Sequence, residues 1–174
     1  IDVQNAHNLK NMGNFPTLSS LDLTLNSAIF LKDFQGFESV ENIGNLDISS
    51  CYSLVSFEGL NNTKSINEIN LAFLRELNNF ENLNHLESLN HLELKHFTNE
   101  TSLTGLENLD YLKHLELFGI ELKDFSGLEN IKNIENLIIQ SCDSIHNLKG
   151  LESLEKISTH IQLSNCSELA DISQ

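Results

Sequence analysis

The sequence predicts an α/β-type repeat solenoid, in which about seven turns of roughly 23 residues stack their short strands into one parallel β-sheet. Three observations predict it. An apolar-x-apolar triplet recurs along the chain, a glycine usually follows it twelve to fifteen residues later, and an apolar residue usually comes directly after that glycine. The segments that return the chain to the next strand are expected to be short helices or irregular. We expect residues 1–174 to form a single domain of a longer protein, because neither end carries a polar cap sequence.

The triplet marks each expected strand. Successive triplets begin 20, 25, 23, 23, 23, 22 and 24 residues apart. Side chains alternate between the two faces of a strand, so the first and third residues should point into the core and the middle one outward. The triplets are Ile1-Asp2-Val3, Leu21-Asp22-Leu23, Leu46-Asp47-Ile48, Ile69-Asn70-Leu71, Leu92-Glu93-Leu94, Leu115-Glu116-Leu117, Leu137-Ile138-Ile139 and Ile161-Gln162-Leu163.

The glycines mark the expected turns. Glycine tolerates a positive φ, which most residues avoid, and the apolar residues that follow it should hold the return segment on the core. One turn cannot bury its own apolar face, so the turns should stack with their strands about 4.8 Å apart. The turn positions are Gly13, Gly36, Gly59, Gly105, Gly127 and Gly150, with Asn82 in place of glycine once.

The charge of the chain excludes several classes of partner. The formal net charge is -15, whereas binding to nucleic acid or to an anionic membrane requires clustered lysine and arginine. No stretch approaches the ~18 consecutive apolar residues of a membrane span, so direct insertion into a membrane is not expected. A protein with a basic surface would suit this charge best.

The three cysteines share one position in the repeat. Three is an odd number, which argues against a disulfide framework. Cys51, Cys142 and Cys166 each lie five residues after the start of a triplet, so we expect buried free thiols. Other turns fill this position with Ala6, Asn26, Leu74, Phe97 and Ile120.

Residues 36–54 carry a family resemblance. Gly-Phe-Glu-Ser-Val at 36–40, followed by Leu-Asp-Ile-Ser-Ser-Cys-Tyr-Ser-Leu at 46–54, resembles the receptor L-domain type of leucine-rich repeat, and residues 127–145 and 150–169 repeat the pattern. The chain is also similar to bacterial internalin-type repeats. The resemblance implies a right-handed leucine-rich-repeat solenoid in a secreted or cell-surface bacterial protein. The free cysteines would also suit the cytoplasm, including that of a host cell.

The outward residues of the triplets are candidates for a binding surface. Acidic side chains one strand apart repel each other, and a partner that relieves the repulsion is favoured. The sheet face is the usual contact surface of repeat proteins of this kind. The candidates in this row are Asp22, Asp47, Asn70, Glu93, Glu116 and Ile138.

Residues beside the triplets extend this surface. Lys95 and Phe118 should lie next to Ile138, giving an exposed apolar centre with a polar rim. His91 and His114 should be direct neighbours, near the glutamates of the outward row. Two imidazoles and two carboxylates are metal-binding groups, but strand neighbours are coplanar and zinc requires a tetrahedron, so we predict surface histidines and no metal site.

The motif search favours binding over catalysis. No G-x-S-x-G, P-loop, H-E-x-x-H or G-x-G-x-x-G pattern occurs. We therefore predict a non-enzymatic module, without a cofactor, that recognises a protein through the outward face of its sheet. The alternatives are a structural spacer of a long surface protein and the substrate-recruiting arm of an effector enzyme whose catalytic part lies elsewhere. A carbohydrate ligand stays open as an alternative but has no support, since the chain has no Trp and only two Tyr.

Overall fold

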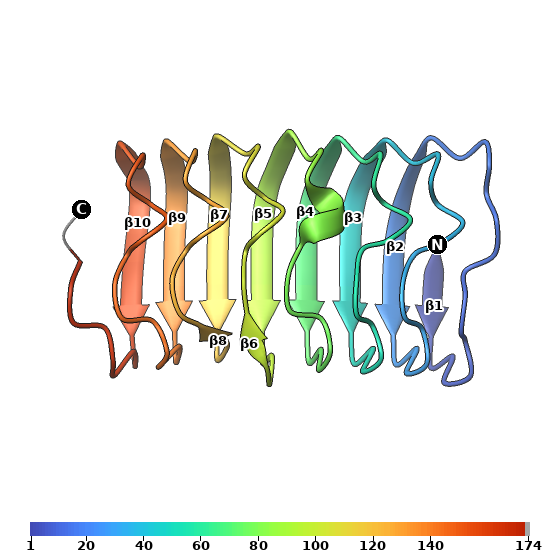
Figure 1. Ribbon diagram of the computed structural model, residues 1–174, viewed down its shortest axis with the longest axis horizontal. Coiled ribbons are helices and arrows are strands. Elements are labelled where there is room, and N and C mark those ends of the chain that lie inside the picture. The colour runs from blue at the N-terminus through green and yellow to red at the C-terminus, as the bar shows by residue number, and fades with distance from the viewer. Residues whose placement is uncertain (173–174) are drawn as a thin grey trace.

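The computed structural model describes residues 1–172 and is a β-solenoid built on one long parallel sheet (Figure 1). Eight strands pair in the order β1-β2-β3-β4-β5-β7-β9-β10, so each turn lies between its neighbours in sequence. A second, two-stranded parallel sheet joins β6 and β8 in the connecting segments. The strands are β1 (Asp2–Gln4), β2 (Ser20–Asn26), β3 (Asn42–Ser49), β4 (Ser65–Ala72), β5 (Ser88–Lys95), β6 (Glu100–Thr101), β7 (Tyr111–Phe118), β8 (Glu121–Leu122), β9 (Asn133–Gln140) and β10 (Lys156–Ser164).

The predicted inward and outward pattern is confirmed in the central strands. In β4, Ile69 and Leu71 are buried, whereas Asn70 between them is partly exposed. The strands are longer than the triplet, because a further buried residue, Ile66 in β4, lies three positions earlier. Two successive outward residues, Asn67 and Glu68, separate it from the triplet. Each turn from β2 to β9 therefore contributes three strand side chains to the core. The prediction is wrong at the two ends, where Ile1 is 46% and Ile161 49% exposed, because an end turn has a neighbour on one side only.

The register of the second turn was predicted wrongly. Leu23 pairs with Leu46, and Thr24, not Asp22, lies beside Asp47. The β2 sequence Leu-Asp-Leu-Thr-Leu contains two overlapping triplets, and alternation alone does not distinguish them. With Leu23 as its start, the second triplet begins 22 residues after the first and 23 before the third, so the irregular intervals of 20 and 25 disappear.

A bulge explains the shift. Asp22 occupies one position opposite two residues of β3, Gly44 and Asn45. Its carboxylate accepts a hydrogen bond from the Asn45 backbone N–H at 2.8 Å. A side chain at Gly44 would overlap this carboxylate. The position of Asp22 at the bulge therefore depends on the glycine opposite it.

The cysteine position is interior, as predicted. All three cysteines are free, with Cys51 and Cys142 buried and Cys166 partly exposed. Burial raises the pKa of the Cys51 and Cys142 thiols, which keeps both protonated and unreactive. The corrected register puts Ala28 in this position of the second turn in place of Asn26, and Ala28 is fully buried.

The return segments are irregular and almost free of helix. The one helix among residues 1–172 is the 3₁₀ turn η1 (Glu81–Leu83), and no helix there is long and apolar enough to span a membrane. Gly59 and Gly105 have φ values of +102° and +105°. Asn82 holds the equivalent position between them, where a residue with a side chain rarely adopts such an angle. The chain winds into the 3₁₀ turn at the place where the glycine is missing.

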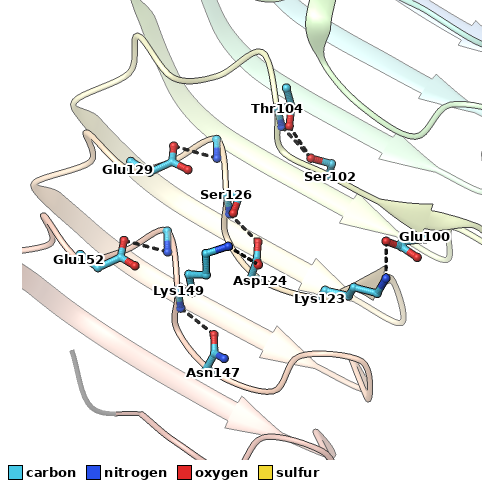
Figure 2. A network of polar contacts seen from close by, with 12 residues as sticks. Glu100, Ser102, Thr104, Lys123, Asp124, Ser126, Glu129, Asn147, Lys149 and Glu152 are labelled. Carbon is cyan, nitrogen blue, oxygen red and sulfur yellow. Dashed lines mark hydrogen bonds and ion pairs between the residues drawn. The ribbon is translucent and has the colours of Figure 1, made fainter.

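Many acidic side chains cap backbone groups of these turns. The carboxylate two residues after a turn glycine accepts a hydrogen bond from that glycine's N–H, as Glu129 does from Gly127 and Glu152 from Gly150, both at 2.9 Å (Figure 2). Asp124 similarly accepts from the Ser126 N–H at 2.9 Å. Part of the negative charge of the chain therefore stabilises the solenoid rather than serving a partner.

Acid should weaken these caps. Hydrogen bonds from Gly36 lower the pKa of Glu38, and hydrogen bonds from Ser167 lower that of Asp143. Burial acts to raise the pKa of Asp124, but hydrogen bonds from Ser126 and Lys149 outweigh it and lower the pKa.

A carboxyl whose pKa is lowered by folding stabilises the folded state above its ordinary pKa, and this stabilisation is lost as the pH falls through the folded value. We therefore expect the thermal midpoint to fall as the pH is lowered below about 4. Circular dichroism at a series of pH values measures it. The triple variant Glu38→Gln, Asp124→Asn, Asp143→Asn should show a shallower dependence, and an identical slope would contradict the capping role.

Candidate recognition face

Three columns of side chains cover the outward face of the sheet. The central column is Asp2, Thr24, Asp47, Asn70, Glu93, Glu116, Ile138 and Gln162. The upstream column, two residues earlier in each strand, is Asn45, Glu68, His91, His114, Asn136 and His160. The downstream column, two residues later, is Gln4, Asn26, Ser49, Ala72, Lys95, Phe118, Gln140 and Ser164.

All the predicted site residues except Asp22 lie in these columns. Asp22 is exposed on the same strand, but its carboxylate is engaged at the bulge with the Asn45 N–H. Thr24 takes its place in the central column. The acidic row is therefore interrupted, and Glu93 and Glu116 are the pair of acidic residues that lie directly side by side in it.

Polar neighbours partly neutralise the central column. The Asn70 amide donates to the Asp47 carboxylate at 2.5 Å, and the Lys95 ammonium lies 2.6 Å from the Glu93 carboxylate. The Glu116 carboxylate lies 3.7 Å from Nε2 of His91. Glu93 and Glu116 each keep 21% of their side-chain surface exposed, so both still present negative charge to a partner.

The two central histidines are neighbours, as predicted. The ring centroids of His91 and His114 are 5.3 Å apart, with the rings tilted by 54°. His114 contacts the Asn136 amide through Nδ1 at 3.0 Å. Within residues 1–172, no group of three or more His, Cys, Asp or Glu side chains is arranged to hold a metal ion.

The outward face is uneven, with a step in its height, because the side chains of the downstream column differ in length. Ser49 and Ala72 are short, whereas Lys95 and Phe118 on the next two strands are long. Beside this step lies a shallow hollow of about 180 Å³, whose lining includes Asp47, Asn70 and Glu93 from the central column.

Phe118 and Ile138 are less exposed than predicted. Both are half-buried, and the Lys95 ammonium lies 5.3 Å from the centroid of the Phe118 ring. A cation above an aromatic face is attracted to its π electrons. The apolar centre of the face therefore exists, but its neighbours cover part of it.

The sequence prediction missed an aromatic pair at the downstream edge of the sheet. Phe73 and His96 directly follow the downstream column, and their rings stack with centroids 5.0 Å apart. Phe73 is 51% exposed. A signal was present in the sequence, because most other turns carry Asn, Ser or Gly at this position.

Two further hollows lie beside the sheet. One, of about 380 Å³, is lined by Lys95, His96, Phe118, Gly119, Gln140 and Ser141. It adjoins the recognition face, because it shares Lys95 and Phe118 with the downstream column.

The other hollow, of about 310 Å³, lies at the upstream edge, and its lining includes Glu38, Glu41, Asn62, Lys64 and His85. Its polar groups are largely engaged within the solenoid. Glu38 caps a turn glycine, Asn62 donates to the Glu38 carbonyl at 2.8 Å, and Lys64 lies 3.2 Å from Glu41. This hollow is therefore a weaker candidate for a binding site.

Comparisons with protein-family models, with curated proteins and with solved structures found no match to this chain. Its function is therefore argued from the surface of the molecule itself.

Proposed function

We propose that this chain is a right-handed leucine-rich-repeat solenoid that acts as a non-enzymatic protein-recognition module. The step of 22 to 24 residues between triplets supports the repeat type. Parallel strands joined by a crossover are almost always connected in the right-handed sense, which supports the handedness. The resemblance to bacterial surface repeats favours a secreted or cell-surface setting.

The composition of the recognition face is the observation that carries the proposal. Phe118 and Ile138 supply a half-buried apolar centre, and Glu93 and Glu116 supply adjacent negative charge. Protein interfaces commonly combine an apolar centre with a polar rim. A structural spacer has no use for such a combination. The partner that fits it is a protein surface rich in lysine or arginine, with an apolar side chain among them.

Selection from a phage-displayed library of random short peptides tests the proposal without a known partner. The immobilised protein should enrich peptides that combine basic and apolar residues. The double variant Glu93→Lys, Glu116→Lys should bind these peptides at least about tenfold more weakly, because it places like charges against the basic residues.

The matched control reverses two acids that lie away from the face. Glu76 and Glu81 are exposed, and no side-chain hydrogen bond or ion pair of either occurs among residues 1–172. Glu129 would be a poor control, because it caps Gly127. The variant Glu76→Lys, Glu81→Lys should keep the wild-type affinity. If the two double variants weaken peptide binding equally, or if neither weakens it, the outward face is not the binding surface.

A further inference from the structure

The position directly after the downstream column has an unusual backbone in every turn. Its residues have φ values between 54° and 59°, in the left-handed region. They are Asn5, Ser27, Ser50, Phe73, His96, Gly119, Ser141 and Asn165. Glycine adopts this conformation freely, and asparagine and histidine are enriched in it, whereas a bulky residue such as phenylalanine is a strained outlier there. Phe73 is the strained residue of the set, and such strain concentrates at functional sites.

Phe73 and His96, the aromatic residues of this set, form a platform of stacked rings. The Phe73 and His96 rings lie 5.0 Å apart and within 20° of parallel. Phe57 and Phe80 stack in the same manner inside the core, with centroids 5.3 Å apart. The distance between turns therefore matches the distance at which aromatic rings stack.

The next place in this stack has no side chain. It belongs to Gly119, where an added Cβ would lie 3.1 Å from Nδ1 of His96. One side of the imidazole is covered by Phe73, and the side toward Gly119 adjoins the hollow of about 380 Å³. We call this space the Gly119 hollow.

We propose that the Gly119 hollow binds an aromatic side chain of the protein partner, which becomes the third ring of the Phe73–His96 stack. This inference rests on the proposed function and names the anchor of the partner. Phe118 contributes a second ring to the lining, Lys95 an ammonium paired with Glu93, and Gln140 and Ser141 are its polar residues, a combination that suits an aromatic side chain with a polar end.

An aromatic side chain fits the hollow better than a sugar does. A sugar ring also stacks on aromatic rings, but its hydroxyls need several free polar groups around the edge of the ring. The Lys95 ammonium, the cation of this lining, is already held 2.6 Å from the Glu93 carboxylate. Aromatic residues are moreover the side chains most often buried as anchors at protein interfaces.

Titration of the ¹⁵N-labelled protein with N-acetyltryptophanamide, followed by NMR, tests the inference. The amides of His96, Gly119 and Ser141 should shift together and saturate with a Kd on the order of a millimolar, as for a small fragment. Methyl glucoside at the same concentrations should leave them unchanged. Shifts with methyl glucoside alone, or no shifts with either probe, would overturn the proposal.

Filling the hollow gives the decisive variant. Asparagine occupies the equivalent position at Asn5 and Asn165, so the backbone at 119 accepts it, and the His96 ring needs to move by only a few tenths of an ångström to admit the new Cβ. Gly119→Asn should therefore fold and weaken N-acetyltryptophanamide binding about tenfold or more. Ser50→Asn makes the same kind of change on a distant turn and should bind as the wild type does. Equal binding by Gly119→Asn and the wild type would overturn the proposal.

Removing the platform separates binding from stability. His96→Asn should weaken binding to a similar degree, and its urea midpoint should stay close to that of the wild type, because histidine and asparagine both tolerate this backbone conformation. A clearly lower midpoint would show that the ring pair serves the fold, and would contradict the proposal.

The result of this titration can be distinguished from the result of the peptide selection that tests the proposed function. The neutral probe does not depend on the charges of Glu93 and Glu116. Failure of the probe, with peptides still sensitive to charge reversal, would reject the Gly119 hollow and keep the recognition face.

Discussion

Replacing Gly59 with alanine is expected to destabilise the protein by more than about 4 kcal/mol, a loss that few single substitutions cause. Gly59 has a φ of +102°, which residues with a side chain rarely adopt. A Cβ at this position would also overlap the carbonyl group of Phe34 on the preceding turn. That neighbour is backbone, so the turns would have to move apart to relieve the overlap.

The variant Gly13→Ala separates the cost of the positive φ from the cost of the overlap with the neighbouring backbone. Gly13 has a similar φ of +90°, but an added Cβ would meet its nearest neighbour, a ring atom of Phe15, at 3.9 Å, an ordinary contact. This variant should lose only the conformational part, roughly 1–3 kcal/mol. Urea denaturation followed by circular dichroism compares the two. Equal losses would contradict the close backbone packing between turns.

Replacing Leu115 with alanine should cost roughly 2–5 kcal/mol, because Leu115 is fully buried and its removal leaves a cavity. The adjacent Glu116 points outward, and Glu116→Ala should cost less than about 0.5 kcal/mol. The two variants differ by one position on one strand, so each is the other's control. Denaturation that ranks them in the opposite order would contradict the assignment of the inner and outer faces.

The strands could be predicted because each has a local alternation of apolar and polar residues, and this alternation recurs about every 23 residues. The prediction failed at β2, where Leu21, Leu23 and Leu25 alternate without a break and two registers fit equally well. The even spacing of 22 and 23 residues on either side of Leu23 favours one of them, and in the structure the hydrogen bond from the Asn45 N–H to Asp22, 23 positions apart, accompanies that register. Alternation within one strand carries no information about such a contact.

The residues on the outward face of the sheet were predicted in outline, but their contacts were not. The membership of the columns follows from strand geometry, so Glu93, Glu116 and Ile138 were located correctly. The ion pair between Lys95 and Glu93 depends on how two flexible side chains turn, which a sequence pattern does not specify. The half-buried state of Phe118 likewise depends on the side chains around it.

NMR mapping of a peptide selected on the immobilised protein tests the central claim most directly, since it locates the contact surface without any mutation. We expect the perturbed amides to concentrate in 47–49, 70–72, 93–95 and 116–119, along the outward face and its downstream edge. Perturbations confined to the amides around Glu38, Asn62 and His85, at the upstream hollow, would contradict it.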